Sequence, residues 1–155
     1  LEGNWEEPYQ HLYVEEFKNL ETVPGIDRVL EATGAFPRAI ASNSDRERII
    51  RSLDLVGLLH LFEGKIASAT DVEHGKPDPA VYLLGASHIG VDPKKSIAIE
   101  DAYPGATAAL AAGMHTFVYL EHQAPAEWQE NPALHTFSSM FDLPDILQDF
   151  LNSTD

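Results

Sequence analysis

Apolar residues follow two different spacings along this chain, and the two spacings alternate. One is the spacing of three or four residues that is typical of an amphipathic helix, and the other is a short apolar run of the kind found in buried strands. The predicted helices span residues 9–20, 26–32, 45–55, 78–89, 104–112 and 141–151. The predicted strands span residues 38–42, 65–69, 96–99 and 116–120, and residues 122–132 are expected to form an irregular surface excursion.

The alternation of strands and helices after residue 25 predicts an α/β fold. Parallel strands need a long crossover, usually a helix, and that helix covers one face of the sheet. We therefore expect a parallel sheet with helices on both faces. Ligands of such sheets bind beyond the carboxyl ends of the strands, so the residues that directly follow each strand are the candidates for a functional site.

Capping residues predict where two of the helices begin. Ser44 and Glu47 have the spacing of a capping box at the start of the third predicted helix. Asp78 followed by Pro79 predicts an N-cap and a first helical position for the fourth.

Length and composition indicate one globular domain, since the chain has 155 residues, of which 44% are hydrophobic. Twenty-five acidic and ten basic residues give a net charge of −15, which disfavours nucleic acid and anionic membranes as partners. A small phosphorylated substrate stays compatible with that charge, because a bound metal can invert the local field. The absence of cysteine excludes thiolate catalysis and Cys-ligated zinc. With no apolar run of membrane-spanning length, we expect a soluble cytoplasmic protein.

Ser42 and Asn43 follow the first predicted strand and lead straight into a helix. A hydroxyl group beside the free N–H groups of a helix start can bind an anion. Because Ser44 is better placed to cap that helix, Ser42 is the stronger candidate for binding phosphate. A serine and an asparagine after a strand are a weak signal when taken alone.

Lys76 lies in the stretch Gly-Lys-Pro-Asp-Pro, residues 75–79. Pro77 disfavours helical backbone at Lys76, and a helix starts immediately afterwards. The ammonium group is therefore held beside a helix start, where it could neutralise a phosphate or a carboxylate. The alternative is an ordinary solvated lysine, since most lysines lie at the surface.

Glu100 and Asp101 end the strand predicted over residues 96–99. Two neighbouring carboxylates repel each other, and a cation between them would offset that repulsion. Their oxygen atoms suit Mg²⁺, which commonly takes one or two carboxylates, several waters and a substrate phosphate. Both side chains could reach one ion, because Glu100 shares a face with Ala98 and Asp101 lies where the chain leaves the strand. The alternative is a solvated acidic pair in a loop.

Taken together, Ser42-Asn43, Lys76-Pro77 and the Glu100-Asp101 motif with its Pro-Gly and Ala-Ala-Gly-Met sequence resemble the haloacid dehalogenase (HAD) superfamily. The resemblance covers residues 23–120, and it is closest to the branch that contains sugar-phosphate phosphatases and β-phosphoglucomutase. It implies a Rossmann-like, HAD-like core with a helical cap.

The resemblance also implies a role for each residue. Ser42 would bind the transferring phosphoryl group with help from the backbone at Asn43, and Lys76 would stabilise charge in the transition state. Glu100 and Asp101 would hold the Mg²⁺ ion. Dehalogenases of the superfamily lack this acidic pair, so its presence favours phosphoryl transfer over dehalogenation.

The sequence departs from the family at one point, because it contains no Asp-x-Asp-Gly-Thr stretch to supply the aspartate nucleophile. We expect residues 1–22 to be the last part of the cap and residues 23–155 to be the core without its first, central strand. The loss would leave unpaired backbone and exposed apolar surface. A homo-oligomer or strand exchange is then expected to replace the strand.

Two functions follow from these motifs. One is a Mg²⁺-dependent phosphatase of small phosphate monoesters such as sugar phosphates, and we expect this chain to be a truncated form of it that is inactive without the missing nucleophile. The other is a non-catalytic HAD-like domain that binds phosphate or a partner, or that assembles through its exposed sheet.

Overall fold

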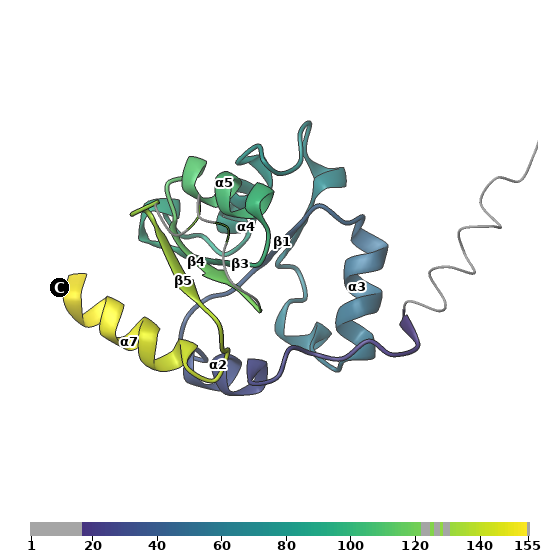
Figure 1. The fold of residues 1–155 in the computed structure, drawn as a ribbon. Helices are drawn as coiled ribbons and strands as arrows, with labels where there is room; N and C mark the ends of the chain where they lie inside the picture. Colours follow the sequence, from purple (N-terminus) through teal and green to yellow (C-terminus); the bar gives the residue numbers. More distant parts are fainter. Residues whose placement is uncertain (1–16, 122–124, 126–127, 129–130, 155) are drawn as a thin grey trace, which may run out of the picture.

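The computed structural model describes residues 17–121, 125, 128 and 131–154 (Figure 1). Residues 9–16 of the helix predicted over residues 9–20, and much of the excursion predicted over residues 122–132, lie outside this part of the chain. In the rest of that predicted helix residue 17 is helical, and residues 18 and 19 form a turn. The strands are β1 (Ile40–Ser42), β2 (Ile66–Ser68), β3 (Ile97–Glu100), β4 (His115–Tyr119) and β5 (Leu134–Phe137). The helices are α2 (Ile26–Ala32), α3 (Arg46–Leu55), α4 (Ala80–His88), α5 (Tyr103–Ala111) and α7 (Leu143–Thr154). Short 3₁₀ turns span Leu59–Leu61, Ala69–Asp71 and Pro93–Lys95.

The predicted α/β fold with parallel strands is confirmed, because each observed strand pair is parallel. The strands form two sheets and not one continuous sheet: β1 pairs with β2, and the second sheet has the order β3-β4-β5. In the described part of the chain β1 and β3 each have a strand on one side only. We call the β1-β2 sheet and the β3-β4-β5 sheet the two halves of the fold, and no strand pairing observed among the described residues joins them.

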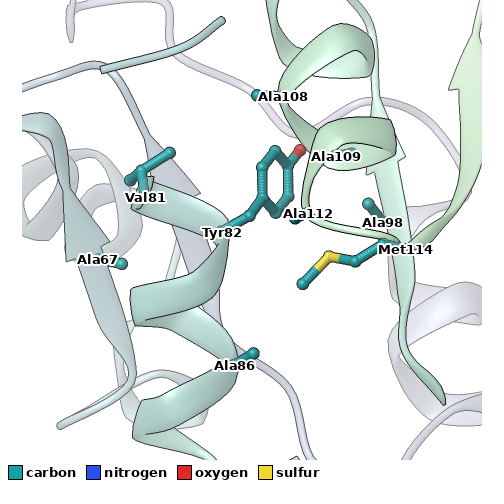
Figure 2. Packing of buried hydrophobic residues seen from close by; sticks show 9 residues of the cluster. All are labelled: Ala67, Val81, Tyr82, Ala86, Ala98, Ala108, Ala109, Ala112 and Met114. Carbon is teal, nitrogen blue, oxygen red and sulfur yellow. The ribbon is translucent and has the colours of Figure 1, made fainter. Parts of the chain in front are cut away.

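Helices pack on both halves and hold them together. On one face α4 and α5 bury a layer of small side chains that includes Ala67 of β2 and Ala98 of β3. Figure 2 shows Tyr82 of α4 directed toward the alanines of α5 within this layer. On the other face, α2 contributes Val29 to the cluster over β4 and β5 and Leu30 to the cluster over β1 and β2.

The start of α3 corrects a capping prediction. Asp45, and not Ser44, is the N-cap, because its Oδ1 accepts the N–H of Arg48 at 2.8 Å. Glu47 is therefore the second helical residue and does not complete a capping box. Ser44 instead donates its own N–H to Ser42 Oγ at 3.1 Å. An observed capping box lies at the end of β2, between Ser68 and Asp71.

Two other elements differ from expectation. The prediction of Asp78 as N-cap and Pro79 as first helical residue is wrong by one residue, because α4 begins at Ala80 and Pro79 is its N-cap. Asp78 nevertheless accepts the N–H of Ala80 at 2.9 Å. The strand β5 was not predicted, because only the ends of its Leu-His-Thr-Phe sequence are apolar and it lies at the edge of its sheet. Among the described residues no helix reaches the length and apolar character that crossing a bilayer requires.

Candidate functional site

The five residues singled out in the sequence lie along one connected path at the carboxyl ends of β1 and β3. Ser42 is the last residue of β1, and Glu100 is the last residue of β3. Lys76 comes from the loop before α4 and bridges the two, since its backbone contacts Asn43 and its side chain contacts Glu100. The structure therefore brings residues from three separate segments of sequence to one place.

The side chain of Asn43 holds the backbone of Lys76 at two points. Its Oδ1 accepts the N–H of Lys76 at 2.7 Å, and its Nδ2 donates to the Lys76 carbonyl at 3.1 Å. Gly75 permits this approach, because a Cβ at that position would lie 2.7 Å from Asn43 Oδ1. The peptide bond between Lys76 and Pro77 is cis. Asn43 thus places the lysine, a role that the sequence did not suggest for its side chain.

The side chains of Lys76 and Glu100 form a buried ion pair. Lys76 Nζ donates to Glu100 Oε1, and the two side chains are 11% and 8% exposed. Removing one partner of such a pair leaves an uncompensated charge in a poorly solvated place, which typically costs about 3–5 kcal/mol. The prediction that Lys76 is held at a fixed point is borne out in its contacts, and a solvated lysine is excluded.

Tyr82 of α4 contacts both members of the ion pair, although the sequence gave no reason to select it. Its hydroxyl group donates to the same Oε1 atom of Glu100, and its ring centroid lies 4.8 Å from Lys76 Nζ. Burial raises the pKa of Tyr82 well above its ordinary value, and the charge of Glu100 raises it further. The tyrosine is therefore a neutral hydrogen-bond donor across the physiological pH range.

The carboxylate of Glu100 rests on the first turn of α5. A Cβ at Gly105 would lie 2.1 Å from Glu100 Oε2, so only glycine leaves room for the carboxylate there. The Oε2 atom also accepts the N–H of Asp101 at 3.3 Å. The glycine that follows the acidic motif is thus required by the position of the Glu100 carboxylate.

Asp101 follows Glu100 where the chain leaves β3, and it is exposed. Glu100 shares the face of Ala98, as the strand alternation predicted, since both are buried. Two adjacent carboxylates with no nitrogen or sulfur donors suit Mg²⁺, which keeps several waters. Within the described residues no three His, Asp or Glu gather into a metal-binding group, so the usual ligand set of zinc is not found there.

Ser42 lies half-buried at the tip of β1, opposite Ser68 in the register with β2. Its Oγ accepts the N–H of Ser44, and its hydroxyl hydrogen can still donate to an anion. Asn43 beside it is exposed. Phosphate binding by these two residues stays a prediction.

A polar network at the end of β2 supports the neighbouring strand end. Asp71 Oδ2 accepts the N–H of Ser68 at 2.8 Å and is 2.6 Å from Arg46 Nη2. The Ser68 N–H and, beside it, Arg46 lower the pKa of Asp71 below its ordinary value. Ser68 in turn donates to the carbonyl of Ser44 at 2.7 Å, which ties β2 to the loop after β1. Sequence reasoning missed this network, because its members are scattered and individually unremarkable.

Comparison with known proteins places these motifs in a family. Residues 4–113 match the family model described as a haloacid dehalogenase-like hydrolase. A 6-phosphogluconate phosphatase of Escherichia coli is 30% identical over 129 residues, which are 82% of this chain and 57% of that protein. A fructose-1-phosphate phosphatase of E. coli is 38% identical over 96 residues, 62% of this chain and 50% of that protein. The chain thus spans about half the length of the curated relatives it matches.

A solved structure shares both the fold and part of the sequence. A HAD family hydrolase of Deinococcus radiodurans, with bound phosphate and sodium, superposes with a TM-score of 0.73 and is 31% identical. The match covers 82% of this chain and 59% of that one. This agrees with the α/β architecture read from the strand pairing.

Proposed function

Because this chain belongs to the haloacid dehalogenase-like hydrolase family, we propose that it forms the phosphate- and Mg²⁺-binding part of a phosphatase that acts on small phosphate monoesters. The main support is the buried Lys76–Glu100 pair, set between the open end of β1 and the exposed Asp101. Relatives that are named as phosphatases of 6-phosphogluconate and fructose 1-phosphate favour a sugar phosphate as substrate.

Each residue has a defined task in this proposal. Ser42 and the backbone at Asn43 bind the phosphoryl oxygens, and the ammonium group of Lys76 donates to the same oxygens. Asp101, with Glu100 behind it, would hold Mg²⁺. When bound, Mg²⁺ supplies positive charge that neutralises the phosphoryl oxygens.

The residues named above serve to bind phosphate and Mg²⁺, whereas hydrolysis of an ester also needs a nucleophile. The sequence contains no Asp-x-Asp motif. In the Phe-Asp-Leu-Pro-Asp stretch, Asp142 directly precedes α7 and Asp145 lies in its first turn. We therefore expect these 155 residues alone to bind phosphate and Mg²⁺ without hydrolysing an ester. The family relationship and the absence of cysteine also lead us to propose a cytoplasmic setting.

Calorimetric titration of the purified chain with inorganic phosphate and MgCl₂ tests the proposal. We expect Mg²⁺ and phosphate to bind cooperatively, and Asp101→Asn to weaken Mg²⁺ binding at least tenfold. The matched control is Asp149→Asn, which removes an exposed carboxylate from α7. Equal binding by the wild type and Asp101→Asn would reject Asp101 as a ligand. A parallel assay of phosphate release from sugar phosphates shows whether a nucleophile is present after all.

A second candidate function rests on the divided sheet. We propose that the free edges of β1 and β3 pair with an added strand, donated by a second copy of this chain. Ile99 is consistent with this, because its apolar side chain is 41% exposed on one face of β3, where the side chains of an added neighbouring strand would help to cover it. A strand between β1 and β3 would pair both edges at once.

Sedimentation equilibrium over a range of concentrations tests the association. We expect reversible dimers or larger assemblies, and Ile99→Lys should weaken them. Leu83→Lys is the matched control, since Leu83 is 44% exposed on α4, away from the strand edges. A monomer at every concentration would contradict the proposal.

A further inference from the structure

Tyr82 contacts both members of the ion pair, yet the proposed function gives it no task. It is 8% exposed, and its hydroxyl group and Lys76 Nζ donate to the same atom, Glu100 Oε1. Glu100 Oε1 therefore has two side-chain donors, and one of them, Lys76, is also expected to bind phosphate.

The two donors make the contacts of Lys76 exchangeable. An ammonium group has three N–H donors, and a phosphoryl oxygen would compete with Glu100 for them. If Lys76 were the sole donor to Oε1, turning it toward phosphate would leave a buried carboxylate oxygen unsatisfied. With Tyr82 present, Oε1 keeps a hydrogen bond throughout.

The surroundings keep Glu100 from following the lysine. Gly105 lies directly against its carboxylate, and the Asp101 N–H contacts Oε2. The Tyr82 ring, 4.8 Å from Lys76 Nζ, also gives the ammonium a favourable contact.

We infer that Tyr82 is a positioning residue for phosphate binding: its hydroxyl group holds Glu100 in place while Lys76 exchanges its contact with Glu100 for one with a phosphoryl oxygen. This inference rests on the proposed function. The inference predicts that removing the hydroxyl oxygen alone weakens phosphate binding. Tyr82→Phe tests this, since it keeps the ring, its packing among the alanines of α5, and its contact with Lys76.

The experiment is a calorimetric titration of inorganic phosphate, in the presence of MgCl₂, into the wild type, Tyr82→Phe and Tyr119→Phe. Tyr119 is the matched control, because it lies on β4 and packs on the opposite face of the sheet, 5.6 Å from the ring of Phe137. We expect Tyr82→Phe to bind phosphate about tenfold more weakly and Tyr119→Phe to bind like the wild type.

A cycle with Glu100→Gln distinguishes positioning from a general loss of structure. The glutamine has no charge that needs the tyrosine, so adding Tyr82→Phe to Glu100→Gln should weaken phosphate binding less than twofold. A tenfold effect in both backgrounds would overturn the inference, as would equal affinity of Tyr82→Phe and the wild type. If the wild type itself binds no phosphate, the proposed function fails first, and the inference fails with it.

Discussion

The carboxylate of Glu100 lies against the α-carbon of Gly105, so closely that a Cβ there would be 2.1 Å from Oε2. The contact joins the end of β3 to the first turn of α5 and fixes where the carboxylate can point. The helix start is therefore part of the site and not merely a connection to it.

Gly105→Ala is expected to destabilise the fold by about 1–3 kcal/mol, because Glu100 has to move and cannot do so without disturbing Lys76. Urea denaturation measures the loss. Gly85→Ala is the control, since a Cβ there meets neighbouring Cβ atoms at 3.8 Å, an ordinary contact distance. In α4 that alanine should stabilise by about 0.5–1 kcal/mol. If the two variants lose equal stability, the contact between Gly105 and Glu100 does not constrain the carboxylate.

Asn43→Ala removes both hydrogen bonds that hold the Lys76 backbone. Because Asn43 is exposed, we expect a modest loss of about 1 kcal/mol in the free energy of unfolding. Phosphate affinity should fall more steeply than stability, since the lysine is no longer held beside the strand end. Calorimetry and denaturation on one sample give both quantities.

Gly75→Ala should disturb the same hydrogen bonds between Asn43 and the Lys76 backbone, because its Cβ would lie 2.7 Å from Asn43 Oδ1. It should weaken phosphate binding in the same direction as Asn43→Ala, and the two effects should not add. Full additivity would show that the two residues act separately.

Asp71 makes the stability of the β2 end depend on pH. Its pKa is lower in the folded chain than its ordinary value of 3.8, first through the N–H of Ser68 and also through Arg46. A lowered folded pKa means that the stabilisation is present above the unfolded pKa and is lost as pH falls through the folded pKa. We expect the stability difference between the wild type and Asp71→Asn to be constant near neutral pH and to shrink below about pH 4. A difference that persists unchanged at pH 2 would contradict this account.

The sequence predicted those parts of the fold that depend on local signals. Apolar runs located four strands, and the strand ends drew attention to Ser42, Glu100 and Asp101, since ligands of a parallel sheet bind at the carboxyl ends of its strands. Lys76 was found from its Pro-flanked sequence in the loop before α4. The pairing leaves β1 with β2 as its partner and β3 with β4. That a central strand is missing between them stays a prediction.

Contacts made across the fold could not be predicted in the same way. Tyr82 reads as one apolar position of a helix, and nothing in the local sequence reveals that its hydroxyl group faces Glu100, 18 residues away. The close approach of Gly105 to Glu100 likewise depends on how α5 leaves β3. The helix cap at α3 could not be predicted either. Ser44 and Asp45 both have side chains that suit an N-cap, and only the residue at which the first turn begins shows that Asp45 is the cap.

The buried Lys76–Glu100 pair offers the most direct test of how the site is held together. Lys76→Met leaves Glu100 with Tyr82 as its remaining side-chain donor, and it should destabilise the fold by about 3 kcal/mol. Adding Glu100→Gln removes the uncompensated charge, so the double variant should regain most of that loss although it contains neither ion. Chemical denaturation of the two single variants and the double variant gives the coupling energy. Two losses that simply add would show that the ions stabilise the fold independently, and Tyr82 would then have no pair to hold.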